Sequence, residues 1–156
     1  MTDYIVASLP ALAFGAPPPI TWEKFVETCG GDNSPVLRSM REGKWADLET
    51  QLRNAVAQAR GGERWKRPAA GCSLYWKNRV LACFQEKDVA RRDEMLDRVW
   101  WDAAEELADP ASPLGEGALA AYAVRLSIAV RRSRMSKESG NAAFDRLTAE
   151  TKNPEF

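Results

Sequence analysis

The sequence predicts an all-α fold, an irregular bundle of about six helices with a short extended N-terminal segment. Apolar residues recur at spacings of three and four in at least four segments, which is the spacing of one helix face. Capping residues, glycines and prolines punctuate the ends of these segments. No stretch alternates apolar and polar residues as a half-buried strand does. We therefore expect a helical bundle with short connections.

Residues 1–20 are expected to form an extended, proline-rich segment that packs on the bundle. Within it, residues 4–14 are apolar and carry β-branched Ile5 and Val6, so their pattern fits either a strand or a first helical turn. The consecutive prolines that follow predict a rigid connector. We interpret the segment as mature structure and not a signal peptide, because it lacks a basic start. The whole of 1–156 is expected to be a single helical domain.

Start and stop signals delimit the helices that follow this segment. Thr21, Ser34, Ser73 and Asp88 are of the types that cap helix N-termini, and Pro35 stands at the favoured first helical position. Glycines and prolines stand at the expected helix ends. The expected helices cover residues 22–29, 35–42, 44–60, 74–84, 88–107, 117–134 and 136–151. The sixth of these is apolar on two sides, which is typical of a helix in the centre of a bundle.

Composition argues against several classes of function. The chain has 22 basic and 22 acidic residues, and this balance argues against bulk attraction to nucleic acid or anionic lipid. Histidine is absent, which removes the commonest general base and metal ligand. Cys29, Cys72 and Cys83 match no zinc-binding spacing, so we expect reduced thiols in a cytosol. No apolar run is long enough to predict a transmembrane helix.

Acidic residues cluster along the expected helix 88–107, and the cluster has two interpretations. Paired carboxylates can bind a metal or share a proton, which would suit an enzyme. However, the cluster lacks the histidines that di-metal bundles use, and it falls opposite Val99, Ala103 and Leu107. We therefore favour a solvated helix face. Nucleophile-elbow, phosphate-loop and dinucleotide-binding motifs are also missing, so we expect no catalytic residue, no cofactor, no metal and no enzyme activity.

The candidate partner-binding residues are five cations near the C-terminus and one tryptophan. They are Arg125, Arg131, Arg132, Arg134, Lys137 and Trp101. Cations in the last turn of a helix interact favourably with its macrodipole, and this is one interpretation of the arginines. The other is a docking patch for an acidic partner, since the acidic stretch 93–109 and the basic stretch 125–137 would make the chain dipolar.

Trp100 and Trp101 are adjacent on one expected helix. Neighbouring side chains on a helix point about 100° apart, so both cannot face one strip of core. One of the two should be buried, and the other should lie at an edge or an interface. Exposed tryptophan is enriched at binding hot spots, which makes this pair relevant to partner binding.

Two stretches of the sequence resemble one bacterial protein family. The first is Tyr4-Ile5-Val6-Ala7-Ser8-Leu9-Pro10, followed by Phe14-Gly15, Pro18-Pro19-Ile20 and Phe25. The second is Trp100-Trp101, Tyr122, Leu126, Ile128 and Arg131 or Arg132, followed by the run Met135 to Gly140, in which Ser136 replaces an acidic cap. Both resemble the uncharacterised domain-of-unknown-function family 2764. The second is also similar to the helical C/d subunit of V/A-type ATPases.

This resemblance implies a function in an ATPase complex. Members of the family are typically encoded beside subunits of a bacterial V/A-type ATPase, and the C/d subunit seats the rotor stalk on the membrane ring. The resemblance therefore implies a non-catalytic subunit or accessory protein that binds the stalk or ring from the cytoplasm, peripheral to the inner membrane and without inserting into it. The chain is less than half as long as a usual C/d subunit. A free-standing helical adaptor with another partner is the alternative.

Overall fold

The computed structural model describes the backbone of residues 1–152, and the side chains of residues 1–135 and 145–148. Within the described backbone the elements are helical, and no strand is present apart from an isolated bridge between Asp109 and Ser112. The α-helices are α1 (Thr2–Ser8), α2 (Trp22–Thr28), α3 (Pro35–Glu42), α4 (Lys44–Ala59), α5 (Leu74–Cys83), α6 (Val89–Ala103) and α7 (Glu116–Lys152). Two 3₁₀ segments, η1 (Glu63–Trp65) and η2 (Ala104–Leu107), complete them. The prediction of an all-α bundle is confirmed.

Side-chain caps begin four of these helices, at the residues that the sequence indicates. Thr21 Oγ1 accepts a hydrogen bond from the Lys24 amide at 3.1 Å, and Asp88 Oδ1 accepts from the Ala90 amide at 3.0 Å. Ser34 and Ser73 cap α3 and α5 in the same way. Each cap satisfies an amide that has no partner inside its helix, so it fixes where the helix begins.

The N-terminal segment differs from the expectation, because residues 2–8 form a helix and are not extended. The helix turns Ile5 and Val6 toward an apolar cluster that also contains Leu119 and Leu126. It ends before Pro10, since a proline disfavours the α conformation in the residue that precedes it. The rest of the segment, up to residue 20, contains no regular element, and several of its apolar side chains lie against the core clusters.

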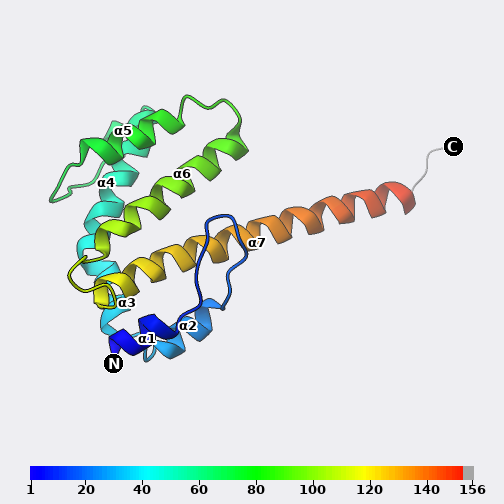
Figure 1. Cartoon of the computed structure of the whole chain (residues 1–156). Coiled ribbons are helices and arrows are strands. Elements are labelled where there is room, and N and C mark those ends of the chain that lie inside the picture. The colour runs from blue at the N-terminus through cyan, green and yellow to red at the C-terminus, as the bar shows by residue number, and fades with distance from the viewer. Residues whose placement is uncertain (153–156) are drawn as a thin grey trace.

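The C-terminal half also differs, because α7 is one continuous helix and not two helices separated near Ser136. A serine inside a helix costs little when no proline or helix-ending glycine accompanies it, so it does not force a break. Figure 1 shows the C-terminal part of α7 extending beyond the other helices. At its start, Gly117 lies against η2, where a Cβ atom would come within 2.0 Å of the Leu107 carbonyl oxygen. Only glycine permits that approach.

The core consists of two apolar clusters that share α7. One joins α4, α5, α6 and α7 and includes the fully buried Leu52, Val80 and Val99. The other joins α1, α2, α3 and α7 around Phe25 and Leu126. Figure 1 shows α7 running between the α4–α6 layer and the α1–α2 layer. The prediction that this helix is central is confirmed, and its two apolar sides face the two clusters.

Val89, which the helical pattern places on the buried face of α6, is 71% exposed because it lies in the first turn, beyond the packed part of that helix. None of the helices in the described part of the chain is long and apolar enough to cross a membrane.

Candidate partner-binding surface

Arg131 and Arg132, two of the candidate binding residues, both bind one carboxylate inside the protein. Asp97 on α6 faces α7, and its side chain is only 10% exposed. One of its oxygens accepts a hydrogen bond from Arg131 Nη2, and the other accepts from Arg132 Nη1 at 2.9 Å. The two arginines therefore join α7 to α6, and much of their charge is compensated within the molecule.

Arg125 and Trp101 form a second contact between the same helices. Arg125 Nε donates to the Trp101 carbonyl oxygen at 3.0 Å, and its Nη2 lies 3.1 Å from Glu105 Oε2. Trp101 itself is only 7% exposed, and its indole packs edge-on against Phe14 with ring centroids 5.5 Å apart. The choice of Trp101 as a surface contact is therefore wrong. Its neighbour Trp100 is the partly exposed member of the pair.

Of the remaining candidates, Arg134 is exposed on α7, and the Lys137 side chain lies outside the described residues. The expected separation of charge between α6 and α7 is also corrected. Asp97 and Glu105 form ion pairs with Arg125, Arg131 and Arg132 at one helix seam, and these charges neutralise each other. The candidate cations thus do not form one continuous basic patch in the described structure.

The acids at the C-terminal end of α6 are engaged in contacts, whereas Asp93 and Glu94 are exposed. Asp102 accepts from Arg79 at 2.9 Å and lies 3.2 Å from Arg98 Nε. Glu106, which follows in η2, accepts a hydrogen bond from the Trp76 indole. Among the residues whose side chains are described, no three acids or cysteines are grouped to hold a metal ion. These carboxylates serve chiefly to join α5 to the end of α6.

Cys29 and Cys83 are not activated nucleophiles. Burial raises the pKa of the Cys29 thiol, and burial also raises the pKa of Cys83, whose Sγ donates to the Arg79 carbonyl oxygen at 3.3 Å. Both thiols are therefore held in the protonated form, which is a poor nucleophile. Cys72 is exposed, and all three cysteines are free thiols.

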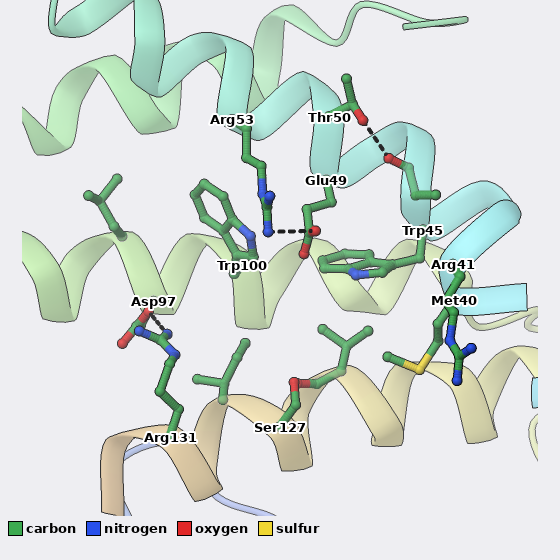
Figure 2. A pocket seen from close by; sticks show the side chains of 14 residues that line it. Met40, Arg41, Trp45, Glu49, Thr50, Arg53, Asp97, Trp100, Ser127 and Arg131 are labelled. Atoms are coloured by element: carbon green, nitrogen blue, oxygen red, sulfur yellow. Dashed lines mark hydrogen bonds and ion pairs between the residues drawn. The ribbon is translucent and has the colours of Figure 1, made fainter. Parts of the chain in front are cut away.

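A groove of about 810 Å³ lies between α4, α6 and α7. Figure 2 shows Trp45 from α4 and Trp100 from α6 on its wall. Apolar side chains line its floor, namely Met40, Leu96, Val124 and Ile128. Charged groups form its rim: Arg41, the Glu49–Arg53 ion pair at 3.0 Å, and the Asp97–Arg131 pair.

The hydroxyl groups in this groove are already engaged in local hydrogen bonds. Ser127 Oγ donates to the Val124 carbonyl oxygen at 2.6 Å, and Thr50 Oγ1 donates to the Ala46 carbonyl oxygen at 2.8 Å. Neither hydroxyl donates to a base that could activate it, as nucleophilic catalysis requires. The groove therefore offers apolar contact and peripheral charges, a combination suited to binding a polypeptide side chain.

Comparison of the chain with family models, with curated proteins and with solved structures found no match.

Sequence reasoning missed a second basic region, which lies on and after the C-terminal half of α4. Arg53, Arg60 and Arg67 line one hollow there, together with the exposed Trp65. The signal was present in the sequence as the run Arg-Gly-Gly-Glu-Arg-Trp-Lys-Arg at positions 60–67. It interleaves cations with an aromatic residue, whereas the stretch 125–137 has cations alone in its last helical turns.

Proposed function

We propose that this chain is a non-catalytic subunit or accessory protein of a bacterial V/A-type ATPase, similar to a C/d subunit. In this proposal it binds the rotor stalk or the membrane ring from the cytoplasmic side. The proposal rests on the resemblance of the two motif stretches, and the contacts between those stretches support it. The free-standing adaptor remains the alternative, because the binding groove does not by itself identify a partner.

The two motif stretches meet in space although more than a hundred residues separate some of their members. The Tyr122 hydroxyl donates to the Pro10 carbonyl oxygen at 2.7 Å. Phe14 packs on Trp101, and Phe25 stacks on Tyr122 with ring centroids 5.7 Å apart. These contacts make the motif residues parts of one packing unit. This is the observation that carries the proposal, because the residues that carry the resemblance act together in one part of the core.

The motif and the binding surface overlap only in part. Among the motif residues whose side chains are described, most are buried or half-buried and hold the scaffold, while Trp100, Ile128 and Arg131 also line the groove. The groove between α4, α6 and α7 is the surface that the scaffold presents. Its tryptophans and its charged rim have the chemistry of an interface centre surrounded by a polar edge. We therefore assign partner binding to this groove and include Arg131 as part of its rim.

Capture with purified ATPase components tests the proposal. The chain would be immobilised and exposed to separately purified stalk and ring subcomplexes, and bound subunits would be quantified. We expect wild-type protein to retain one of them. The variant Ser127→Trp places a bulky group in the groove from an exposed position and should reduce retention. The matched variant Ser133→Trp lies on α7 outside the groove lining and should bind normally.

The outcomes distinguish the candidate functions. Retention of neither subcomplex would contradict the ATPase proposal and leave the adaptor as the better account. Equal retention by both tryptophan variants would contradict the assignment to the groove while leaving the partner in place. Circular dichroism of each variant shows whether the helical fold is intact.

A further inference from the structure

A hollow of about 790 Å³ lies between the C-terminal half of α4 and the segment that follows it. Its cationic lining residues are Arg53, Arg60 and Arg67, and its aromatic lining residue is Trp65, which is 69% exposed. We call this set the basic hollow. The Trp65 indole lies close to the backbone at Gly62. A Cβ atom added at Gly62 would come within 2.9 Å of Trp65 Cδ1.

The segment that carries two of these residues is fixed in place by polar side chains of α4. Asn54 accepts from the Arg67 amide at 2.8 Å and donates to the Arg67 carbonyl oxygen at 2.7 Å. Lys66 Nζ donates to Gln58 Oε1 at 3.0 Å. These bonds hold the backbone of the segment in place, so the Arg67 side chain extends from a fixed position. Such preorganisation lowers the entropy that binding must overcome.

The basic hollow carries an excess of positive charge in a chain that is neutral overall. Its lining contains three arginines and one carboxylate, that of Glu49. Arg53 is paired with Glu49, while Arg60 lies 5.8 Å from the Phe84 ring, a contact that leaves its charge uncompensated. An excess of this kind attracts an acidic partner and raises the rate of its encounter.

The backbone geometry favours spread carboxylates over a single phosphate group. Phosphate sites commonly use converging backbone amides. Here the amides of Gly62, Trp65, Lys66 and Arg67 already donate to Ala57, Gly62, Glu63 and Asn54 respectively. The arginines also come from two separate segments and line a concave wall, which suits an inserted chain segment better than the plane of a bilayer.

We infer that the basic hollow binds an acidic segment of a partner protein, with an apolar side chain of that segment against Trp65. The basic hollow adjoins the groove of Figure 2, and Glu49, Thr50 and Arg53 line both. One partner segment can therefore cross from the groove into the basic hollow. The inference deepens the proposed function and rests on it for the identification of the partner as an ATPase component.

Binding of a synthetic peptide to the purified full chain tests the inference without any ATPase component. The probe is a short fluorescein-labelled peptide of Glu and Asp residues with one central Leu, measured by fluorescence anisotropy at low salt. We expect saturable binding that weakens as salt screens the charges. The double variant Arg60→Glu and Arg67→Glu should bind about ten-fold more weakly, since each exposed ion pair contributes little and two are reversed.

The matched control changes the same amount of charge outside the basic hollow. Lys24→Glu and Arg38→Glu replace two exposed cations on α2 and α3, and this variant should bind within about two-fold of wild type. Circular dichroism checks that both double variants keep their helices.

Three outcomes would overturn the inference. They are no peptide binding at low salt, equal weakening by both double variants, and tighter binding of anionic lipid vesicles or a single-stranded oligonucleotide through Arg60 and Arg67. The peptide result is independent of the stalk and ring capture. If the peptide does not bind but the capture succeeds, the role of the basic hollow is contradicted and the ATPase proposal stands. If the peptide binds but the capture fails, the ATPase partner is contradicted and the role of the basic hollow stands.

Discussion

The hydroxyl of Tyr122 donates a hydrogen bond to the carbonyl oxygen of Pro10, and this bond connects α7 to the segment after α1. Burial raises the pKa of Tyr122, so the hydroxyl stays protonated and able to donate. The ring of Tyr122 also stacks on Phe25 from α2. One side chain of the central helix thus orders both the irregular N-terminal segment and the helix that follows it.

We expect Tyr122→Phe to lower the free energy of unfolding by about 1 kcal/mol, because it removes this bond and leaves the Pro10 carbonyl without its partner. The ring contacts should survive, so the native helical signal should not change. Chemical denaturation followed by circular dichroism measures the loss. Tyr4→Phe, at a 74% exposed position on α1, is the control and should change stability by less than about 0.5 kcal/mol. Equal effects of the two changes would contradict the structural role of the bond.

Most helix starts could be predicted from the sequence because they depend on neighbouring residues. Ser73 caps the amide of Trp76, and Asp88 caps that of Ala90, so both ends of each interaction lie within a few residues. Position 136 shows the limit of this reasoning. A serine there can begin a helix or sit inside one, and the continuous helix that already surrounds it decides between the two.

The candidate site was less predictable because its contacts depend on how helices face each other. Asp97 and Arg132 are 35 residues apart, and helical spacing alone does not show that they share the α6–α7 seam. Similarly, the spacing of Trp100 and Trp101 predicts that one is buried but not which. The packing of Phe14, from the irregular N-terminal segment, decides that it is Trp101.

The loop before α5 should become mobile when its attachment to α4 is removed. Asn54→Ala deletes both hydrogen bonds to the Arg67 backbone, and we expect it to lower stability by about 1 kcal/mol or less at this half-buried position. Local opening should be the larger effect, so trypsin should cleave after Arg64 and Lys66 faster than in wild type. Asn78→Ala, at an exposed position on α5, serves as the control. Unchanged cleavage in Asn54→Ala would contradict this account of the loop.

The same loop gives the protein a predictable response to acid through Asp47. Hydrogen bonds from the Gln51 side chain and the Ala70 amide hold the pKa of Asp47 below its ordinary value. A lowered pKa in the folded state means that the carboxylate stabilises the fold above its unfolded pKa. That stabilisation is lost as the pH falls through the folded value. Asp47→Asn should therefore differ most from wild type near neutral pH, and the difference should shrink below about pH 4.

Urea unfolding midpoints measured across this pH range test the response of Asp47. Asp32→Asn removes an exposed carboxylate before α3 and controls for the change in net charge. If the difference in urea midpoint between wild type and Asp47→Asn grew as the pH fell, its sign would be opposite to that expected for a lowered pKa. The role assigned to the Gln51 and Ala70 hydrogen bonds would then be incorrect.

The Asp97 carboxylate should contribute to stability through the two arginines that it binds. Asp97→Asn keeps the shape of the side chain but removes its charge, and Arg131 and Arg132 can then turn only partly to water. We expect a loss of about 1–3 kcal/mol, which is the range for a hydrogen bond to a charged group or for a partly buried ion pair left incomplete. Asp93→Asn, one turn earlier at an exposed position, should cost less than about 0.5 kcal/mol.

A double-mutant cycle shows whether this loss comes from the contact itself. If Asp97 acts through Arg132, then Arg132→Gln should destabilise wild type more than it destabilises Asp97→Asn, with a coupling of about 0.5–3 kcal/mol. Arg134→Gln, two residues further along α7 and exposed, should show no coupling to Asp97. Additive effects in the Arg132 cycle would contradict the structural assignment and return Arg132 to the role of a surface cation.

Coupling between Asp97 and the arginines also decides where on α7 partner binding can be tested by charge reversal. Reversing the charge of Arg131 or Arg132 would place a carboxylate beside Asp97 and destabilise the α6–α7 seam, so a loss of partner binding in such a variant would report damage to the fold. Arg134 is an exposed position on α7 at which charge reversal leaves the Asp97 contacts in place.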